Sequence, residues 1–239
     1  LLRLLLSVLT LCVTLEPTWA TESTGVGNGG GGWVCRELDG RVRSARLVDF
    51  FEAEAEHHLT LRATATDGGA LIAEARGRIA GINPTFAEIF DRKLAYVRAH
   101  LVDVRNVRLR EVDDSLYRII PSPSTCLDGT LGYEQVVNFS ENGEVLINRD
   151  LFDLLTEQEK AGLFAHEAIY AVLREVESDR NSLRTRRLVG LLFSTLEPNL
   201  YAREFMLTRP HASARIAQLS AGSWHTCAVT PGGQVLCWG

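Results

Sequence analysis

The sequence lacks a surplus of positive charge. Its 25 lysine and arginine residues are outnumbered by 30 aspartate and glutamate residues, which gives a formal net charge of −5 at pH 7. Nucleic-acid affinity depends largely on clustered lysine and arginine side chains that face phosphates. The composition therefore argues against nucleic acid as a partner.

An apolar run long enough to cross a membrane is also missing. Residues 1–20 contain an early arginine, an apolar run over residues 4–15 and a small-x-small pattern that ends at Ala20. Spanning a bilayer takes ~20 apolar residues. We therefore expect a cleaved signal peptide over residues 1–20, no membrane span afterwards, and a secreted, periplasmic or cell-surface protein. Lipidation is disfavoured, because Leu11 precedes Cys12 where a lipoprotein signal needs a small residue.

Closely spaced C-x-x-C pairs are absent, which disfavours a zinc site built from cysteines. Removal of the signal leaves an even number of cysteines in an oxidising compartment, where disulfides are the expected state. The organisation of the chain favours Cys35 with Cys126 and Cys227 with Cys237 among the possible pairings.

A phosphate-binding loop is missing as well. Residues 21–32 are glycine-rich, but no Gly-Lys-Ser/Thr follows them and no strand precedes them. Their composition predicts a flexible tether. After this tether we expect a mixed domain over residues 33–206, a linker over residues 207–215 and a final unit over residues 216–239.

The middle domain carries signals for both hairpins and helices. Asp39-Gly40 and Asn142-Gly143 each separate two short strand candidates, which predicts two β-hairpins. Helix-start signals predict helices that begin near residues 84, 157 and 183. Alternating glutamate and alanine over residues 51–58 predicts a further, solvent-exposed helix. The expected fold class is α+β.

One segment of the middle domain points to chemistry. His166-Glu167-Ala-Ile-Tyr170 resembles the first half of the HExxH helix of zinc metalloproteases, in which two histidines bind zinc and the glutamate polarises water. Tyr170 stands at the position of the second histidine, and tyrosine binds zinc poorly at neutral pH because it must first lose a proton. We therefore expect no cofactor, with zinc as the alternative.

His166, Glu167 and Tyr170 are the candidate catalytic residues of this segment. A degenerate metal site and a metal-free acid–base site are two interpretations of them. The third interpretation has no chemistry, because these side chains also belong to an apolar helix face on which they pack and form hydrogen bonds.

Three segments resemble an uncharacterised family of exported proteins from predatory and gliding bacteria. A Cys-Arg hairpin, a His-Glu-Ala-x-Tyr helix and a Ser-x-x-x-Arg helix recur in that family, and here they are VCRELDGRVRSARLVDFFEAE, LTEQEKAGLFAHEAIY and SLRTRRLVGLLFS. The resemblance implies one folded domain and no known activity. It suggests that Ser182 and Arg186 join His166, Glu167 and Tyr170 in one polar cluster, with a buried ion pair between Arg186 and Glu167.

The segment IAQLSAGSWHTCAVTPGGQVLCWG, residues 216–239, resembles the repeat of the regulator of chromosome condensation family. The repeat-motif residues are Gly222, His225, Thr226, Cys227, Gly233, Cys237, Trp238 and Gly239. Two strands are expected around a turn centred on Gly232, which places Cys227 and Cys237 at equal distances from the turn and hence opposite each other. A disulfide between them is expected, with two packed cysteines as the alternative.

This second resemblance implies a β-propeller that binds proteins through its faces and has no chemistry of its own. The chain starts with leucine rather than methionine, and Gly239 falls inside a repeat. We therefore expect the first, incomplete unit of a propeller, placed apart from the mixed domain.

Three functions are consistent with these features. The first is an exported, non-catalytic module that recognises a protein or surface ligand, and the second is an extracytoplasmic hydrolase built on His166 and Glu167. The third is an adhesin or structural envelope component. A further polar group that meets His166 and Glu167 in an open cleft favours the enzyme, whereas close packing of both favours the binding protein.

Overall fold

The computed structural model describes most of the chain, in seven ranges. These are residues 30–62, 67–111, 119–140, 142–206, 218–221, 226–229 and 235–238. Residues 30–206 contain helices and two sheets, which confirms the mixed α+β class, and the last three ranges are strands. The predicted signal peptide and the linker at residues 207–215 lie outside the described residues.

The first sheet has the strand order β2-β1-β4 and is antiparallel throughout. Its strands are β1 (Gly31–Glu37), β2 (Val42–Leu47) and β4 (Gly129–Gln135). The turn between β1 and β2 contains Gly40 at a φ of +87°, a conformation that favours glycine. The first predicted hairpin is therefore confirmed, and Gly31 and Gly32, which the composition assigns to the tether, belong to its first strand.

The second sheet has the order β3-β6-β5 and is mixed. Its strands are β3 (Leu101–Val104), β5 (Val137–Phe139) and β6 (Val145–Asn148). β5 and β6 are antiparallel around Gly143, whose φ is +81°, and this confirms the second predicted hairpin. β3 pairs with β6 in parallel, which the long connection over residues 105–144, with β4 and β5 in it, allows.

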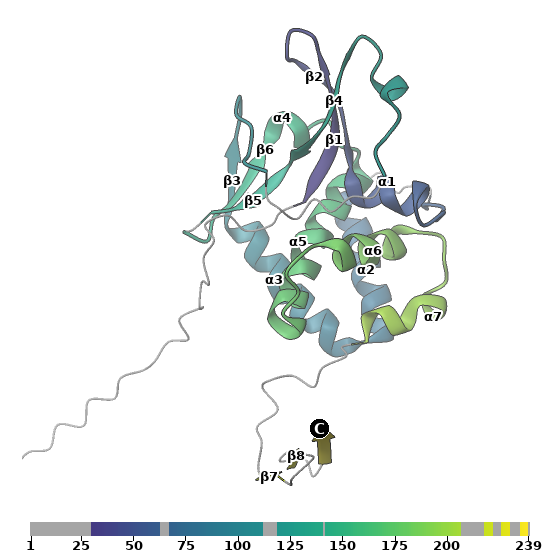
Figure 1. Cartoon of the computed structure of the whole chain (residues 1–239), viewed down its shortest axis with the longest axis vertical. Helices are drawn as coiled ribbons and strands as arrows, with labels where there is room; N and C mark the ends of the chain where they lie inside the picture. Colours follow the sequence, from purple (N-terminus) through teal and green to yellow (C-terminus); the bar gives the residue numbers. More distant parts are fainter. Residues whose placement is uncertain are drawn as a thin grey trace, which may run out of the picture.

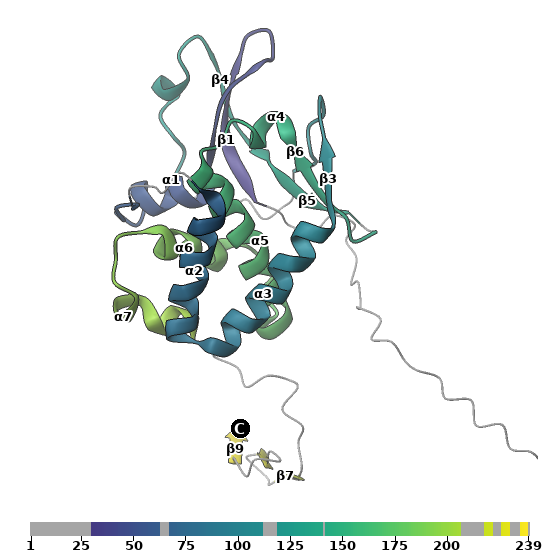
Figure 2. The ribbon, with the colours of Figure 1, turned by 180° about the vertical axis from the view of Figure 1, so that it is seen from behind.

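Most of the helices gather at one end of the domain and the two sheets at the other, where α4 lies beside β6 (Figures 1 and 2). The helices have the following bounds. They are α1 (Val48–Ala55), α2 (Gly68–Ile82), α3 (Pro84–Ala99), α4 (Arg149–Phe152), α5 (Glu157–Glu177), α6 (Leu183–Phe193) and α7 (Pro198–Tyr201), with the 3₁₀ helices η1 (Pro123–Cys126) and η2 (Ala202–Phe205). α5 packs against α2, α3 and α6. No helix within the described ranges is both long and apolar enough to cross a membrane.

The predicted helix starts agree with the structure. Thr156 and Glu159 form a complete capping box at the start of α5, in which each side chain accepts the backbone N–H of the other residue. α3 starts at Pro84, but its cap is Asn83, whose side chain accepts the N–H of Phe86. Leu183, one residue after Ser182, begins α6.

The prediction of a solvent-exposed helix over residues 51–58 is wrong. The helix is α1, which begins three residues earlier and buries Val48, Asp49, Phe50, Glu52 and Ala53. It packs against α6, where the ring of Phe50 lies 5.3 Å from that of Phe193. The glutamate-alanine pattern suggests exposure because it does not reveal that Glu52 meets a buried arginine.

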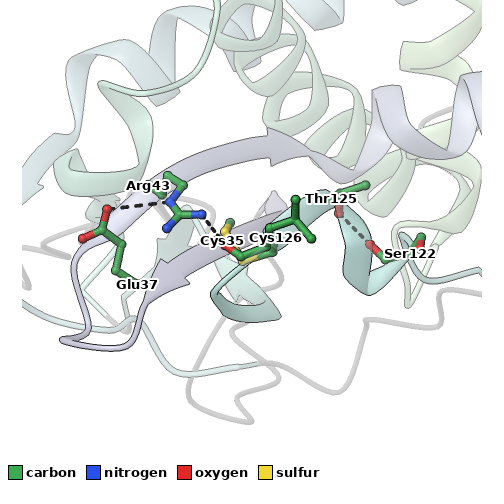
Figure 3. The surroundings of a disulfide bond; sticks show 7 residues. Cys35, Glu37, Arg43, Ser122, Thr125 and Cys126 are labelled. Carbon is green, nitrogen blue, oxygen red and sulfur yellow. Dashed lines mark hydrogen bonds and ion pairs between the residues drawn. A yellow bond between two sulfur atoms is a disulfide. The ribbon is translucent and has the colours of Figure 1, made fainter.

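A disulfide between Cys35 and Cys126 joins β1 to η1, as predicted (Figure 3). Both cysteines are buried, and their Cα atoms are 5.4 Å apart. Arg43 of β2 adds a hydrogen bond to the Leu127 carbonyl and lies 3.7 Å from Glu37. The 3₁₀ segment is therefore held to the first sheet by a covalent bond and by polar contacts.

Three short strands near the C-terminal end form an antiparallel sheet of order β7-β8-β9. They are β7 (Gln218–Ala221), β8 (Thr226–Val229) and β9 (Val235–Trp238). Cys227 lies opposite Cys237 in the register, as predicted, and is disulfide-bonded. Gly222, His225, Gly233 and Gly239 of the repeat motif lie outside the described residues.

Candidate functional site

The three candidate catalytic residues lie on α5 and are buried. His166 and Glu167 are each 1% exposed, and Tyr170 is 2% exposed. The rings of His166 and Tyr170 are 6.3 Å apart, as expected for residues one helical turn apart. Arg174, one turn further on, lies 5.6 Å from the Tyr170 ring in a cation–π contact.

His166 is oriented by a carboxylate that comes from α1. Its Nδ1 lies 2.7 Å from Oδ1 of Asp49, which is fully buried. An ionised carboxylate only accepts hydrogen bonds, so the proton is on Nδ1. Burial by itself lowers the pKa of His166, but the charge of Asp49 and this hydrogen bond outweigh burial and hold the pKa above its ordinary value.

Glu167 binds the residue that precedes β1. The Gly30 N–H donates to Glu167 Oε1 over 2.5 Å. Burial raises the pKa of Glu167 to about 7, against the opposing effects of the His166 charge and the Gly30 hydrogen bond. Near neutral pH, Glu167 is therefore close to the midpoint of its titration.

Three buried polar atoms in this group have no hydrogen-bond partner among the described residues. They are Asp49 Oδ2, His166 Nε2 and Glu167 Oε2. An unsatisfied buried polar atom costs about 1–3 kcal/mol of folding free energy. We call Asp49, His166 and Glu167 the His166 cluster; its geometry suits proton transfer at Nε2 and Oε2.

The predicted supporting residues form a separate ionic group. Arg186 of α6 donates from Nε to Oε2 of Glu52 over 2.7 Å and from NH1 to Oγ of Ser182 over 3.0 Å. The expected ion pair between Arg186 and Glu167 is therefore wrong, because a carboxylate of α1 meets the guanidinium first. We call Glu52, Ser182 and Arg186 the Arg186 cluster.

Zinc does not fit the His166 cluster. Within the described ranges, no three His, Cys, Asp or Glu side chains are arranged to hold a metal ion. Asp49 instead accepts a hydrogen bond from the histidine, and the next turn of α5 offers a tyrosine. The expectation that the protein needs no cofactor stays a prediction.

The His166 cluster does not line the surface cavity beside the β1–β2 turn. A cavity of about 710 Å³ lies between the β1–β2 turn and α4, and its lining includes Arg41, Arg105, Asp150 and Leu154. Its arginines are matched by nearby carboxylates, as in the pairs of Arg105 with Asp150 and Asp153. None of the residues that line this cavity belongs to the His166 cluster.

The sequence patterns did not identify Asp49, Glu52 or Gly30 as partners of the candidate site residues. Asp49 interrupts the apolar run Leu-Val-Asp-Phe-Phe over residues 47–51, and a single acid within such a run is a signal of a buried, paired carboxylate. Glu52 carries no comparable signal. Gly30 was hidden inside a glycine-rich segment whose composition predicts a tether.

One family model matches the chain. The regulator of chromosome condensation repeat matches residues 216–239, which include β7, β8 and β9. No curated protein and no solved structure shows significant similarity to the chain. The repeat suggests a binding module, while the resemblance of the mixed domain to a family of exported proteins has no support from these comparisons.

Proposed function

We propose that the chain is part of an exported bacterial binding protein that recognises a protein or a surface ligand through a β-propeller begun by residues 216–239. The match to the regulator of chromosome condensation repeat carries this proposal. The three antiparallel strands of that segment are consistent with part of a blade. Repeat units bury their cores against neighbours, so the binding face belongs to the assembled propeller.

Export is supported by two features. Residues 1–20 have the composition of a signal peptide. The buried Cys35–Cys126 disulfide and the disulfide-bonded Cys227 suit an oxidising compartment. In this proposal the mixed domain positions the propeller and has no catalytic role, because His166 and Glu167 are closed off from solvent.

Binding to isolated envelopes tests this function. The tagged full-length protein should bind envelopes of the producing cells saturably, and trypsin treatment of the envelopes should abolish this binding. Deletion of residues 207–239 should weaken binding at least tenfold, and His166→Ala should leave it unchanged. Equal binding with and without residues 207–239 would overturn the proposal, and trypsin-resistant binding would indicate a non-protein surface ligand or a structural envelope role.

A second candidate is an extracytoplasmic hydrolase. The observation that favours it is the Asp49–His166 pair, in which the carboxylate orients the ring and leaves Nε2 without a described partner. Hydrolysis of casein or of a peptide library by the full-length protein, lost in His166→Ala, would support it. Unchanged hydrolysis in that variant, or none in either protein, would exclude it.

A further inference from the structure

The glycines before and at the start of β1 are closely packed against other groups. A Cβ at Gly30 would press on the end of the Leu163 side chain, and one at Gly31 on the Tyr133 hydroxyl. One at Gly32 would lie 2.8 Å from the Arg46 carbonyl oxygen, which is backbone, so packing requires glycine there. The described glycines are therefore part of the folded domain and not of a tether.

Gly30 covers the His166 cluster. A Cβ at Gly30 would also lie 3.1 Å from Glu167 Oε1 and 3.7 Å from His166 Cδ2, the atom bonded to Nε2. Both side chains therefore reach the same point, although adjacent residues on a helix point about 100° apart. The unpartnered edge of His166 faces the backbone of Gly30.

The contact at Gly30 is held by three hydrogen bonds. Its N–H donates to Glu167, and its carbonyl accepts from the N–H groups of Val136 and Val137 over 3.0 and 3.1 Å. Gly31 and Gly32 belong to β1, the central strand of the first sheet, where both pair with β4 and Gly32 also pairs with β2. Gly30 precedes the strand, so it has a closed position fixed by these three bonds and, as a glycine, the conformational freedom to leave it once they open.

We propose that Gly30 is a gate that closes over His166 and Glu167 and controls the access of solvent and small ligands to them. Opening moves Gly30 off α5 and exposes Nε2 and Oε2, the two atoms with capacity for a ligand or for proton transfer. This inference does not depend on what the terminal repeat binds.

The charges around the gate make opening depend on pH. The charged groups that act on His166 or Glu167 are these two residues themselves, Asp49 of α1 and Arg186 of α6. Burial is the largest cause of the raised pKa of Glu167, so opening, which hydrates this carboxyl, lowers its pKa. The closed state therefore holds the Glu167 proton more tightly than an open, hydrated one, and opening increases as the pH rises through about 7. Burial lowers the pKa of His166, so hydration of the ring acts in the opposite direction and is smaller than the effect of Glu167 in this proposal.

Amide hydrogen exchange measures this opening directly. The N–H groups of Gly30, Val136 and Val137 report on the gate, and those of α3 serve as an internal reference. After correction for intrinsic exchange rates, protection of the three amides should fall at least tenfold between pH 5 and pH 8. A pKa raised from 4.5 to about 7 sets an upper limit of about 300-fold for Glu167.

Glu167→Gln removes this titration but keeps an oxygen that accepts the Gly30 N–H. The fall in protection should become at least threefold smaller, because Glu167 is the group that releases a proton when opening hydrates it. Glu157→Gln is the matched control, because Glu157 lies at the exposed start of the same helix. A pH-independent wild type, or the same fall in Glu167→Gln as in Glu157→Gln, would overturn the gate.

Gly30→Ala tests the packing argument at a single pH. Diethyl pyrocarbonate modifies exposed imidazole nitrogens, and its rate at His166, read by mass spectrometry at pH 7, should rise at least tenfold in this variant. Gly77→Ala on α2 is the control, because nothing lies within 4 Å of a Cβ there. An unchanged rate in a folded Gly30→Ala protein would contradict the gate, and if this variant does not fold, the Glu167→Gln exchange series decides.

Discussion

The two buried polar clusters take their carboxylates from neighbouring turns of α1, yet they are satisfied to very different degrees. Glu52 meets Arg186, whose guanidinium also reaches Ser182. Asp49 meets His166, and that cluster leaves one atom on each of its three side chains without a described partner. The difference follows from donor number, because a guanidinium has five N–H groups and an imidazole at most two.

This contrast separates a paired ionic group from one that keeps unsatisfied polar atoms among the described residues. A carboxylate paired with arginine repays its desolvation through several hydrogen bonds and holds α1 to α6. The His166 cluster instead has three buried polar atoms without a hydrogen-bond partner among the described residues. Such atoms lower the stability of the fold, and each of them calls for an explanation. Substitutions in the two clusters should therefore have different consequences.

The largest expected effect comes from Arg186→Leu. It leaves Glu52 buried without its partner, and such a loss lowers the free energy of unfolding by about 3–5 kcal/mol. Urea denaturation followed by circular dichroism measures it. The double variant with Glu52→Gln should recover much of the loss, and a cost below about 1 kcal/mol for the single variant would show that the pair is not structural.

Asp49→Asn should have the next largest effect. It replaces the charged acceptor of His166 Nδ1 with a neutral amide oxygen, and a hydrogen bond to a charged group contributes about 1.5–3 kcal/mol of unfolding free energy. The pKa of His166 should also fall, because only the charge of Glu167 then opposes the lowering effect of burial. An NMR titration of His166 checks this, and an unchanged pKa would rule out Asp49 as the residue that orients and charges the ring.

Glu167→Gln should change stability in a pH-dependent way. The folded-state pKa of Glu167 is raised above 4.5 to about 7, so its stabilising contribution is present at low pH and is lost as the pH rises through this interval. The variant should therefore gain about 2 kcal/mol more unfolding free energy, relative to wild type, at pH 8 than at pH 5. Denaturation at both pH values tests it; a gain independent of pH would mean that Glu167 does not titrate there.

Ser182→Ala should have the smallest effect. It removes one acceptor of Arg186 at 3.0 Å and leaves the bond to Glu52 in place, so the expected loss is about 1 kcal/mol of unfolding free energy. Exposed Ser124→Ala is a suitable control for the denaturation experiment. A loss as large as that of Arg186→Leu would instead make the hydroxyl the centre of the Arg186 cluster.

Much of the fold was predictable because its signals are local. The turns at Gly40 and Gly143 and the capping box at Thr156 lie within a few residues of the elements they define. The repeat strands follow the same rule, and Cys227 lies opposite Cys237 because a short hairpin determines both positions. The Cys35–Cys126 bond was also predicted, although its partners are 91 residues apart, because few cysteines were left to pair.

The candidate site was predictable only in part. His166, Glu167 and Tyr170 were found from a motif on one helix, but their partners come from elements more than a hundred residues away, as with Asp49 and Gly30. The local glutamate-alanine pattern predicts that Glu52 is exposed. It is buried because it pairs with Arg186 of α6.

By itself the sequence determined the mixed fold class, the hairpins, the main helix starts, the cysteine pairing and the repeat at the end of the chain. Only the tertiary structure decided that α1 is buried, which carboxylate meets Arg186, and that the glycine run at residues 30–32 packs against other groups. The physical reason is the separation along the chain over which each kind of interaction acts. Turn and cap preferences act between neighbouring residues, whereas the burial of a charge or the absence of a side chain is explained by groups that only folding brings into contact.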